Sequence, residues 1–215
     1  PTYVKKLFEV YFMDDSPLPY DVETDLNDII AERAADYDLV MVTDFGHGML
    51  QPSTIKLLAE KAKFLAVNAQ SNSANLGYNL ITRYPRADYI CIDTHEARLA
   101  VGDKFKEVAD IISEDLSRRI DCDRITVTLG SDGCVTFENE AGVYEVPAIA
   151  GAPVDTVGAG DAFFAITAPI VASGASMKDV GFIGNIAGGL KIGIVGHRRS
   201  IEKTSLVKTA TALLK

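Results

Sequence analysis

The chain has 215 residues, of which 47% are hydrophobic and 24% charged, and its formal net charge is −9. This balance is typical of a globular protein large enough for one full hydrophobic core, and the acidic charge disfavours nucleic acid and anionic membranes as partners. The three cysteines form no C-x-x-C pair, which argues against disulfides and a zinc site and favours a reducing, cytoplasmic location. We recognise neither a transmembrane run nor a signal peptide.

Apolar runs alternate with helical patterns from residue 25 to residue 129. Strands are expected at the nearly continuous apolar runs 39–43, 64–67, 89–92 and 125–129, as for strands that are covered on both faces. The helical patterns around them span 25–35, 53–63, 94–101 and 105–120. This order predicts an α/β protein with a three-layer, doubly wound, mostly parallel sheet.

The pattern then changes to a period of two. Residues 134–138 and 142–146 flank a turn and predict a β-hairpin. The remaining third predicts helices at 161–173, 178–192 and 202–214. A further strand is expected at 4–12, with no evident partner in sequence order.

Polar residues or glycine follow the expected parallel strands. The carboxyl ends of such strands line the ligand crevice of an open sheet, and the residues expected along this edge are Asp44, Asn68, Asp93, Glu96 and Gly130. Turn formation is the alternative explanation for each of them taken alone.

Residues 155–164 read DTVGAGDAFF, in which Gly158, Ala159 and Gly160 lead into Asp161 and an apolar run. This is neither a Walker A motif nor a dinucleotide fingerprint. Backbone N–H groups at a helix start can hold an anion, and a carboxylate beside them can take a proton from a hydroxyl during phosphoryl transfer. The alternative is a glycine-rich helix entry with Asp161 as a capping residue.

The stretch DTVGAGDAFF closely resembles the C-terminal signature of the ribokinase-like (PfkB) family of carbohydrate kinases. ITVTLGSDGCV resembles the nucleotide-side strand and turn of that family, and CIDTHEARLAVG takes the place of its N-x-x-E motif. LVMVTDFGHGML and PTYVKKLFEVYF look most like the heptose-7-phosphate kinase branch, which occurs in bifunctional heptose kinase/nucleotidyltransferase proteins.

The resemblance implies a role for each matching residue. Asp161 would be the catalytic base, the run Gly158 to Gly160 would be the anion hole, and Glu96 would organise Mg²⁺. The implied nucleotide-binding residues are Thr128, Gly130, Asp132, Gly133, Asn185 and Gly188. Asp93, beside the phosphates, is counted with the metal-site residues, and Asp155 and Thr156 match positions that hold a monovalent cation such as K⁺ in some members. We expect Asp44 and Asn68 on the substrate side.

Several departures from the family qualify these roles. Asp93 replaces the family's asparagine, and His47, Asn68 and Gln70 stand where heptose kinases carry lysines, so recognition of a phosphorylated sugar should be weaker. The N-terminal strands and most of the β lid have no counterpart in the sequence. We therefore expect residues 1–215 to be an N-terminally truncated kinase domain, with 1–13 as a remnant of the lid-side strands and an exposed sheet edge that favours a homodimer.

The sequence thus predicts an ATP-dependent kinase that phosphorylates a hydroxyl of a sugar or sugar phosphate. Two alternatives remain open. One is a non-catalytic nucleotide-binding domain of a larger fused protein, and the other is a kinase for a non-sugar alcohol. On the kinase interpretation, the chain alone should bind nucleotide weakly and phosphorylate no sugar at a useful rate.

Overall fold

A computed structural model describes residues 7, 8, 10–149, 153–196 and 198–215. Its strands are β1 (Val40–Asp44), β2 (Leu65–Ala69), β3 (Tyr89–Asp93), β4 (Arg124–Thr128), β5 (Cys134–Glu138) and β6 (Gly142–Val146). They form one sheet in the order β1-β2-β3-β4-β5-β6. The first four strands are parallel and the β5–β6 hairpin is antiparallel, so the carboxyl ends of β1 to β4 share one edge.

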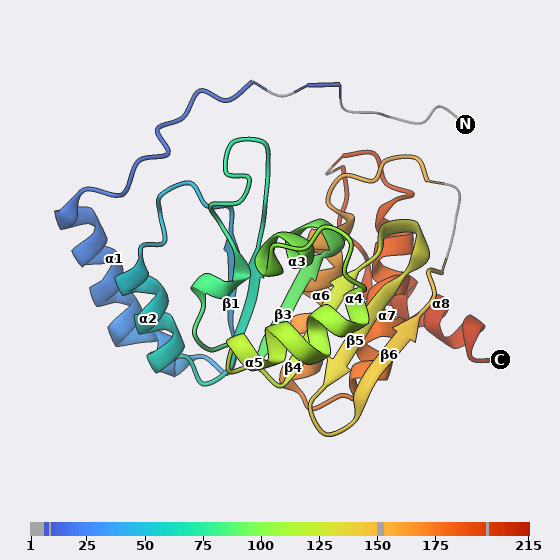
Figure 1. The fold of residues 1–215 in the computed structure, drawn as a ribbon. Helices are drawn as coiled ribbons and strands as arrows, with labels where there is room; N and C mark the ends of the chain where they lie inside the picture. Colours follow the sequence, from blue (N-terminus) through green and yellow to red (C-terminus); the bar gives the residue numbers. More distant parts are fainter. Residues whose placement is uncertain (1–6, 9, 150–152, 197) are drawn as a thin grey trace.

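Helices pack on both faces of this sheet (Figure 1). They are α1 (Tyr20–Arg33), α2 (Pro52–Lys61), α3 (Thr94–Val101), α4 (Val108–Asp110), α5 (Ser117–Arg119), α6 (Ala159–Ala172), α7 (Met177–Lys191) and α8 (Lys203–Leu213). A π-helical segment, η3 (Ile111–Leu116), joins α4 to α5, and the short 3₁₀ turns are η1 (Ala34–Asp36), η2 (Ile81–Arg83) and η4 (Gly130–Asp132). No helix in the described part of the chain has both the length and the apolarity that a membrane span requires.

Alternate residues of the strands build two separate cores. Val67 and Ile92 face the core that α2, α3 and the α4–α5 segment cover, whereas Tyr89 and Cys91 face α6 and α7. The predicted three-layer α/β architecture, with a mostly parallel sheet between helices, is therefore confirmed. The three cysteines, Cys91, Cys122 and Cys134, are buried free thiols.

Two buried contacts fix α6 against its neighbours. The Tyr89 hydroxyl lies 2.9 Å from the Thr167 Oγ1 of α6 and 3.2 Å from the Thr126 Oγ1 of β4, so the sheet and the helix are joined by a polar contact inside an apolar core. A Cβ atom at Gly184 of α7 would lie 2.3 Å from the Phe163 ring, so glycine allows α6 and α7 to approach closely.

Some expected elements differ from the structure. The helix expected at 105–120 begins at Val108 and is π-helical in its middle, where the Ser113 and Ser117 hydroxyls donate to carbonyls four residues earlier and compete with regular helix formation. The helix expected at 25–35 already begins at Tyr20. The strand expected at 4–12 lies partly outside the described residues, and its described residues form no strand.

Candidate active site

Several of the expected polar residues lie where the parallel strands end. Asp44 and Asp93 are the last residues of β1 and β3 rather than the residues after them, because each strand extends one residue further than predicted. Asp93 is paired in register with Thr128, the last residue of β4. Gln70 follows β2, and its Nε2 donates to the Asp161 Oδ1 at 2.6 Å. This contact brings the start of α6 to the same edge.

The start of α6 has the open backbone geometry expected of an anion cradle. The helix begins at Ala159, two residues before the predicted start, because Gly158 turns the chain with φ 78° as its N-cap. No side chain caps the helix, and the N–H groups of Gly160 and Asp161 have no hydrogen-bond acceptor among the described residues. A Cβ atom at Gly160 would meet nothing within 4 Å. These N–H groups and the helix dipole therefore face space that a phosphate could enter.

Asp161 lies in the first turn of α6 and is exposed. Gln70 holds one carboxylate oxygen, Oδ1, and no described residue donates to the other, Oδ2. The side chain is thus oriented while one oxygen keeps its accepting capacity. The alternative explanation of Asp161 as a helix-capping residue is not supported, since its side chain makes no capping hydrogen bond.

Glu96 lies close to this carboxylate and is buried. Its Oε2 accepts from the Asp93 N–H at 2.8 Å, the Asp93 Oδ1 accepts from the Glu96 N–H at 2.7 Å, and the two form a capping box for α3. The Glu96 Oε1 accepts from the Ser71 N–H at 2.9 Å. Burial raises the pKa of Glu96 to about 7, and the charges of Asp93 and, more weakly, Asp161 act in the same direction.

The segment Gln70–Ser71 therefore contacts both of these residues, Asp161 by a side chain and Glu96 by a backbone N–H. Neither the contact of Gln70 with Asp161 nor that of Ser71 with Glu96 was predicted from the sequence. The available signal was their position in the sequence, because residues 70 and 71 directly follow β2.

A hydrated divalent cation fits the charge of this edge. Three carboxylates, those of Asp93, Glu96 and Asp161, lie near one another, and their mutual repulsion helps to raise the pKa of Glu96. Among the residues that the structure describes, no group of three or more His, Cys, Asp or Glu side chains could hold a metal ion directly. Mg²⁺ usually keeps several waters and binds through one or two carboxylates and substrate phosphates, which agrees with this arrangement.

Two of the expected nucleotide residues, Gly133 and Asn185, lie against the end of β6. The Asn185 Nδ2 donates to the carbonyls of Val146 and Pro147 at 3.0 and 3.2 Å. A Cβ atom at Gly133 would lie 2.1 Å from the Val146 carbonyl oxygen. Packing alone therefore explains Gly133 and Asn185. Four residues of the set remain that could face a ligand. They are Thr128, the exposed turn residues Gly130 and Asp132, and Gly188, at which a Cβ atom would meet nothing within 4 Å.

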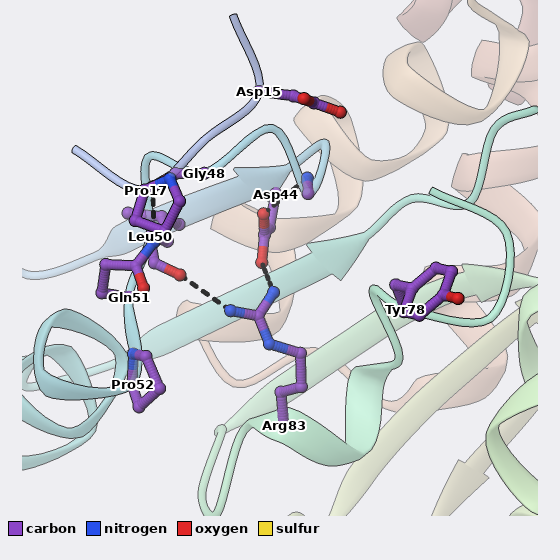
Figure 2. A pocket seen from close by; sticks show the side chains of 10 residues that line it. Asp15, Pro17, Asp44, Gly48, Leu50, Gln51, Pro52, Tyr78 and Arg83 are labelled. Atoms are coloured by element: carbon purple, nitrogen blue, oxygen red, sulfur yellow. Dashed lines mark hydrogen bonds and ion pairs between the residues drawn. The ribbon is translucent and has the colours of Figure 1, made fainter. Parts of the chain in front are cut away.

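A cavity of about 320 Å³ lies beside Asp44 at the carboxyl end of β1 (Figure 2). Asp44 is 4% exposed, and its carboxylate accepts from the Gly46 N–H, the Arg83 Nη1 and the Tyr84 hydroxyl at 2.9, 3.3 and 2.9 Å. Arg83 also donates to the Leu50 carbonyl at 2.8 Å. Burial raises the pKa of Tyr84 well above its usual range, so its hydroxyl remains a donor.

Arg83 lines this cavity and was missed by sequence reasoning, because η2 follows no strand and Arg83 belongs to no motif. Asn68 is not brought into the cavity. It lies inside β2, where its Nδ2 donates to the Cys91 carbonyl at 2.7 Å and its buried Oδ1 has no partner among the described residues. His47, which stands where heptose kinases carry a lysine, contacts the Asn72 side chain.

Asp155 and Thr156 lie on the loop that leads into α6. Asp155 is 4% exposed and accepts from the Val157 and Gly196 N–H groups at 3.0 and 2.7 Å. The Thr156 carbonyl accepts from the Ala159 N–H. These contacts hold the loop that leads into the start of α6.

The chain is similar to carbohydrate kinases in sequence and in fold. A bifunctional protein HldE from Citrifermentans bemidjiense is 24% identical over 176 residues, which cover 81% of this chain and 36% of the relative. The structure of phosphofructokinase-2 from Escherichia coli in complex with potassium aligns with a TM-score of 0.75 at 16% identity, over 93% of this chain and 64% of that one. Arabidopsis thaliana ribokinase complexed with ribose and ATP aligns with a TM-score of 0.67 at 18% identity, over 86% and 58%.

The chain thus spans about a third of the curated relative and about six-tenths of the two solved chains. The sequence profile of the pfkB family carbohydrate kinases matches residues 21–204, which is most of the chain and includes the cradle, Asp161 and Glu96. This protein belongs to the pfkB family of carbohydrate kinases.

Proposed function

We propose that the chain carries the phosphoryl-transfer site of an ATP-dependent kinase whose acceptor is a hydroxyl of a sugar or sugar phosphate, with Asp161 as the base. The observation that carries the proposal is the juxtaposition of an oriented, exposed carboxylate with the open N–H groups of the same helix turn. Membership of a carbohydrate kinase family supports it, as does the fold shared with a ribokinase complexed with ribose and ATP.

The two parts of the α6 start would act together. The Asp161 Oδ2 accepts the proton of the acceptor hydroxyl, which becomes a better nucleophile as the proton leaves. The N–H groups of Gly160 and Asp161 hold the oxygens of the phosphoryl group as negative charge builds on them. Gln70 keeps the carboxylate directed toward the edge of the sheet. These residues are aligned before substrate arrives, so little reorganisation accompanies the reaction.

Glu96 and Asp93 would hold hydrated Mg²⁺ with the nucleotide, and the ion would neutralise phosphate charge. Thr128, Gly130, Asp132 and Gly188 would bind the nucleotide itself. On the acceptor side, we assign the cavity beside Asp44 and Arg83 to the sugar. In a relative named as a bifunctional protein, the chain matches about a third of the length, which supports the proposal that this kinase domain is part of a fused protein.

The replacement Asp161→Asn tests the base. It keeps the shape of the side chain and its contact with Gln70, so turnover should fall by at least about 10²-fold while nucleotide affinity stays within a few-fold. A coupled ADP assay over a panel of sugars and sugar phosphates, with calorimetry for nucleotide, gives both values; it is run on the full-length protein, because residues 1–215 alone are expected to phosphorylate no sugar at a useful rate. Asp25→Asn, at an exposed site on α1, controls for the loss of one negative charge. Turnover by the Asp161 variant within a few-fold of the unmodified protein would remove the assignment.

A nucleotide-binding domain without turnover is the second candidate. It is favoured by the state of Asp44, whose carboxylate already accepts three hydrogen bonds from the protein and has less capacity left for a sugar. In the same assays this candidate predicts nucleotide binding with no ADP production from any sugar in the panel or from non-sugar alcohols. Turnover of a non-sugar alcohol alone would assign a different acceptor to the same site.

A further inference from the structure

Lys191, the last residue of α7, is a buried cation between two loops. It is 6% exposed, and its Nζ donates to the Val157 carbonyl at 2.8 Å and to the Gly196 carbonyl at 3.0 Å. Lysine is rarely buried because removing an ammonium group from water is costly. The side chain of a helix-ending lysine usually extends into solvent, so this burial calls for a specific role.

The two loops are joined to each other around this side chain. The Val154 and Asp155 N–H groups donate to the Ile192 carbonyl at 2.8 and 3.0 Å. The Gly196 N–H donates to the Asp155 Oδ2 at 2.7 Å. Gly196 is thus held from both sides, by the carboxylate through its N–H and by Lys191 through its carbonyl. The loop before α6 and the loop after α7 form one unit with an ammonium group inside it.

Backbone carbonyl oxygens of this kind are also ligands for monovalent metal ions, since carbonyls can replace the hydration shell of K⁺. We propose that Lys191 is a built-in monovalent cation: its ammonium takes the place that a K⁺ ion would occupy between the Val157 and Gly196 carbonyls. On this proposal the residues present do not fit a bound K⁺, so we infer that no such ion binds at Asp155 and Thr156, where the family resemblance implied one. A solved structure of similar fold is a complex with potassium; this chain would not need the ion.

Lys191 is a positioning residue. The carbonyl that it holds belongs to Val157, which precedes the left-handed Gly158 at the start of α6. Fixing this carbonyl fixes the peptide that leads into the anion cradle. The consequence for turnover rests on the proposed function, whereas the consequence for stability rests only on the contacts of the ammonium group.

Two substitutions separate charge from space. Lys191→Ala removes the ammonium and leaves room for an ion between the carbonyls, whereas Lys191→Met removes the charge but fills the space. Lys178→Ala, at an exposed position of the same helix, is the matched control. The thermal midpoint of each protein is measured in KCl, NaCl and choline chloride at one ionic strength, and the coupled ADP assay is run in the same salts.

The unmodified protein and Lys178→Ala should have the same midpoint in KCl as in NaCl. Lys191→Ala should melt roughly 4–10 °C lower in NaCl and choline chloride, as expected for two buried carbonyls that lose a donor, and should recover at least half of the loss in KCl. Lys191→Met should be lowered equally in every salt. Where turnover is measurable, K⁺ should activate Lys191→Ala alone.

Two results would overturn the proposal. One is an unchanged midpoint of Lys191→Ala, or a loss that K⁺ restores no better than Na⁺, either of which would make Lys191 an ordinary structural lysine. The other is a midpoint of the unmodified protein that K⁺ raises over Na⁺, because an ion would then bind beside the lysine. This second measurement decides the matter even if neither variant folds. If turnover is absent even in the full-length protein but the midpoints behave as expected, the proposed function fails and the role of Lys191 stands.

Discussion

Replacing Glu96 by glutamine should remove a pH dependence of stability from the protein. Burial, with the charge of Asp93 nearby, raises the pKa of the Glu96 carboxyl from 4.5 to about 7. The native state then binds the proton more tightly than the unfolded chain, so stability from this group is complete below pH 4.5 and is lost as the pH rises to about 7. At about 1.4 kcal/mol for each pH unit between the two pKa values, the free energy of unfolding should fall by about 3 kcal/mol.

Glutamine has no such titration but has one acceptor oxygen where glutamate has two. It cannot accept from both the Ser71 and Asp93 N–H groups, and an unsatisfied buried donor costs about 1–3 kcal/mol. At low pH the variant should therefore be less stable than the unmodified protein. Above about pH 7 the two should be similar or the order should reverse, because the unmodified protein has lost about 3 kcal/mol.

Urea unfolding followed by circular dichroism, repeated across this pH range, measures the difference between the two proteins. Glu32→Gln, at an exposed site on α1, is the control, and its difference from the unmodified protein should stay nearly constant with pH. The reasoning about burial and charge would be refuted by either of two results for Glu96→Gln. One is a difference in the free energy of unfolding that stays equally constant with pH, and the other is a difference that grows in favour of the unmodified protein as the pH rises.

Two glycine substitutions test the cradle and the helix packing. Gly160→Ala should leave the thermal midpoint unchanged or higher, because its Cβ meets nothing within 4 Å and alanine favours the helix by about 1 kcal/mol. Turnover should nevertheless fall by at least about 10-fold, because the methyl group enters the space expected for the phosphate. Full turnover of this variant would contradict the anion cradle. Gly184→Ala places a Cβ 2.3 Å from the Phe163 ring and should lower the free energy of unfolding by about 1–3 kcal/mol. Gly188→Ala, at an open position of the same helix, should be harmless to stability, and an equal loss in both variants would rule out the packing explanation.

Local patterns predicted the elements well where strong signals marked their ends. The hairpin at 134–138 and 142–146 matches β5 and β6, and the helix at 94–101 matches α3. The α3 boundaries follow from a capping box at Asp93 and Glu96 and from Gly102 in the left-handed conformation at its end. Such signals act within a few residues of the chain and are visible in the sequence.

The contacts that define the site are long-range and were not predicted. Gln70 and Asp161 are 91 residues apart in the sequence, and Asp44 and Arg83 are 39 apart. Side chains of this kind meet only after the sheet and helices have packed, so no periodicity marks them. Lys191 shows the same limit, since a lysine in the last turn of a helix is ordinarily explained by the helix dipole and only the packed loops reveal its carbonyl partners.

The strand order of the sheet has a consequence for folding. Each strand from β2 to β6 is placed beside the strand that precedes it in the chain, so the sheet can grow in one direction as the polypeptide leaves the ribosome, without inserting a strand between earlier ones. The α6 start, which supplies the cradle, belongs to the last third of the chain. We therefore expect nascent chains that end before residue 159 to hold a largely formed sheet, with exposed Tyr89 and Cys91 on the face that α6 and α7 later cover. Synthesis would pass through an interval in which this apolar face is open to chaperones.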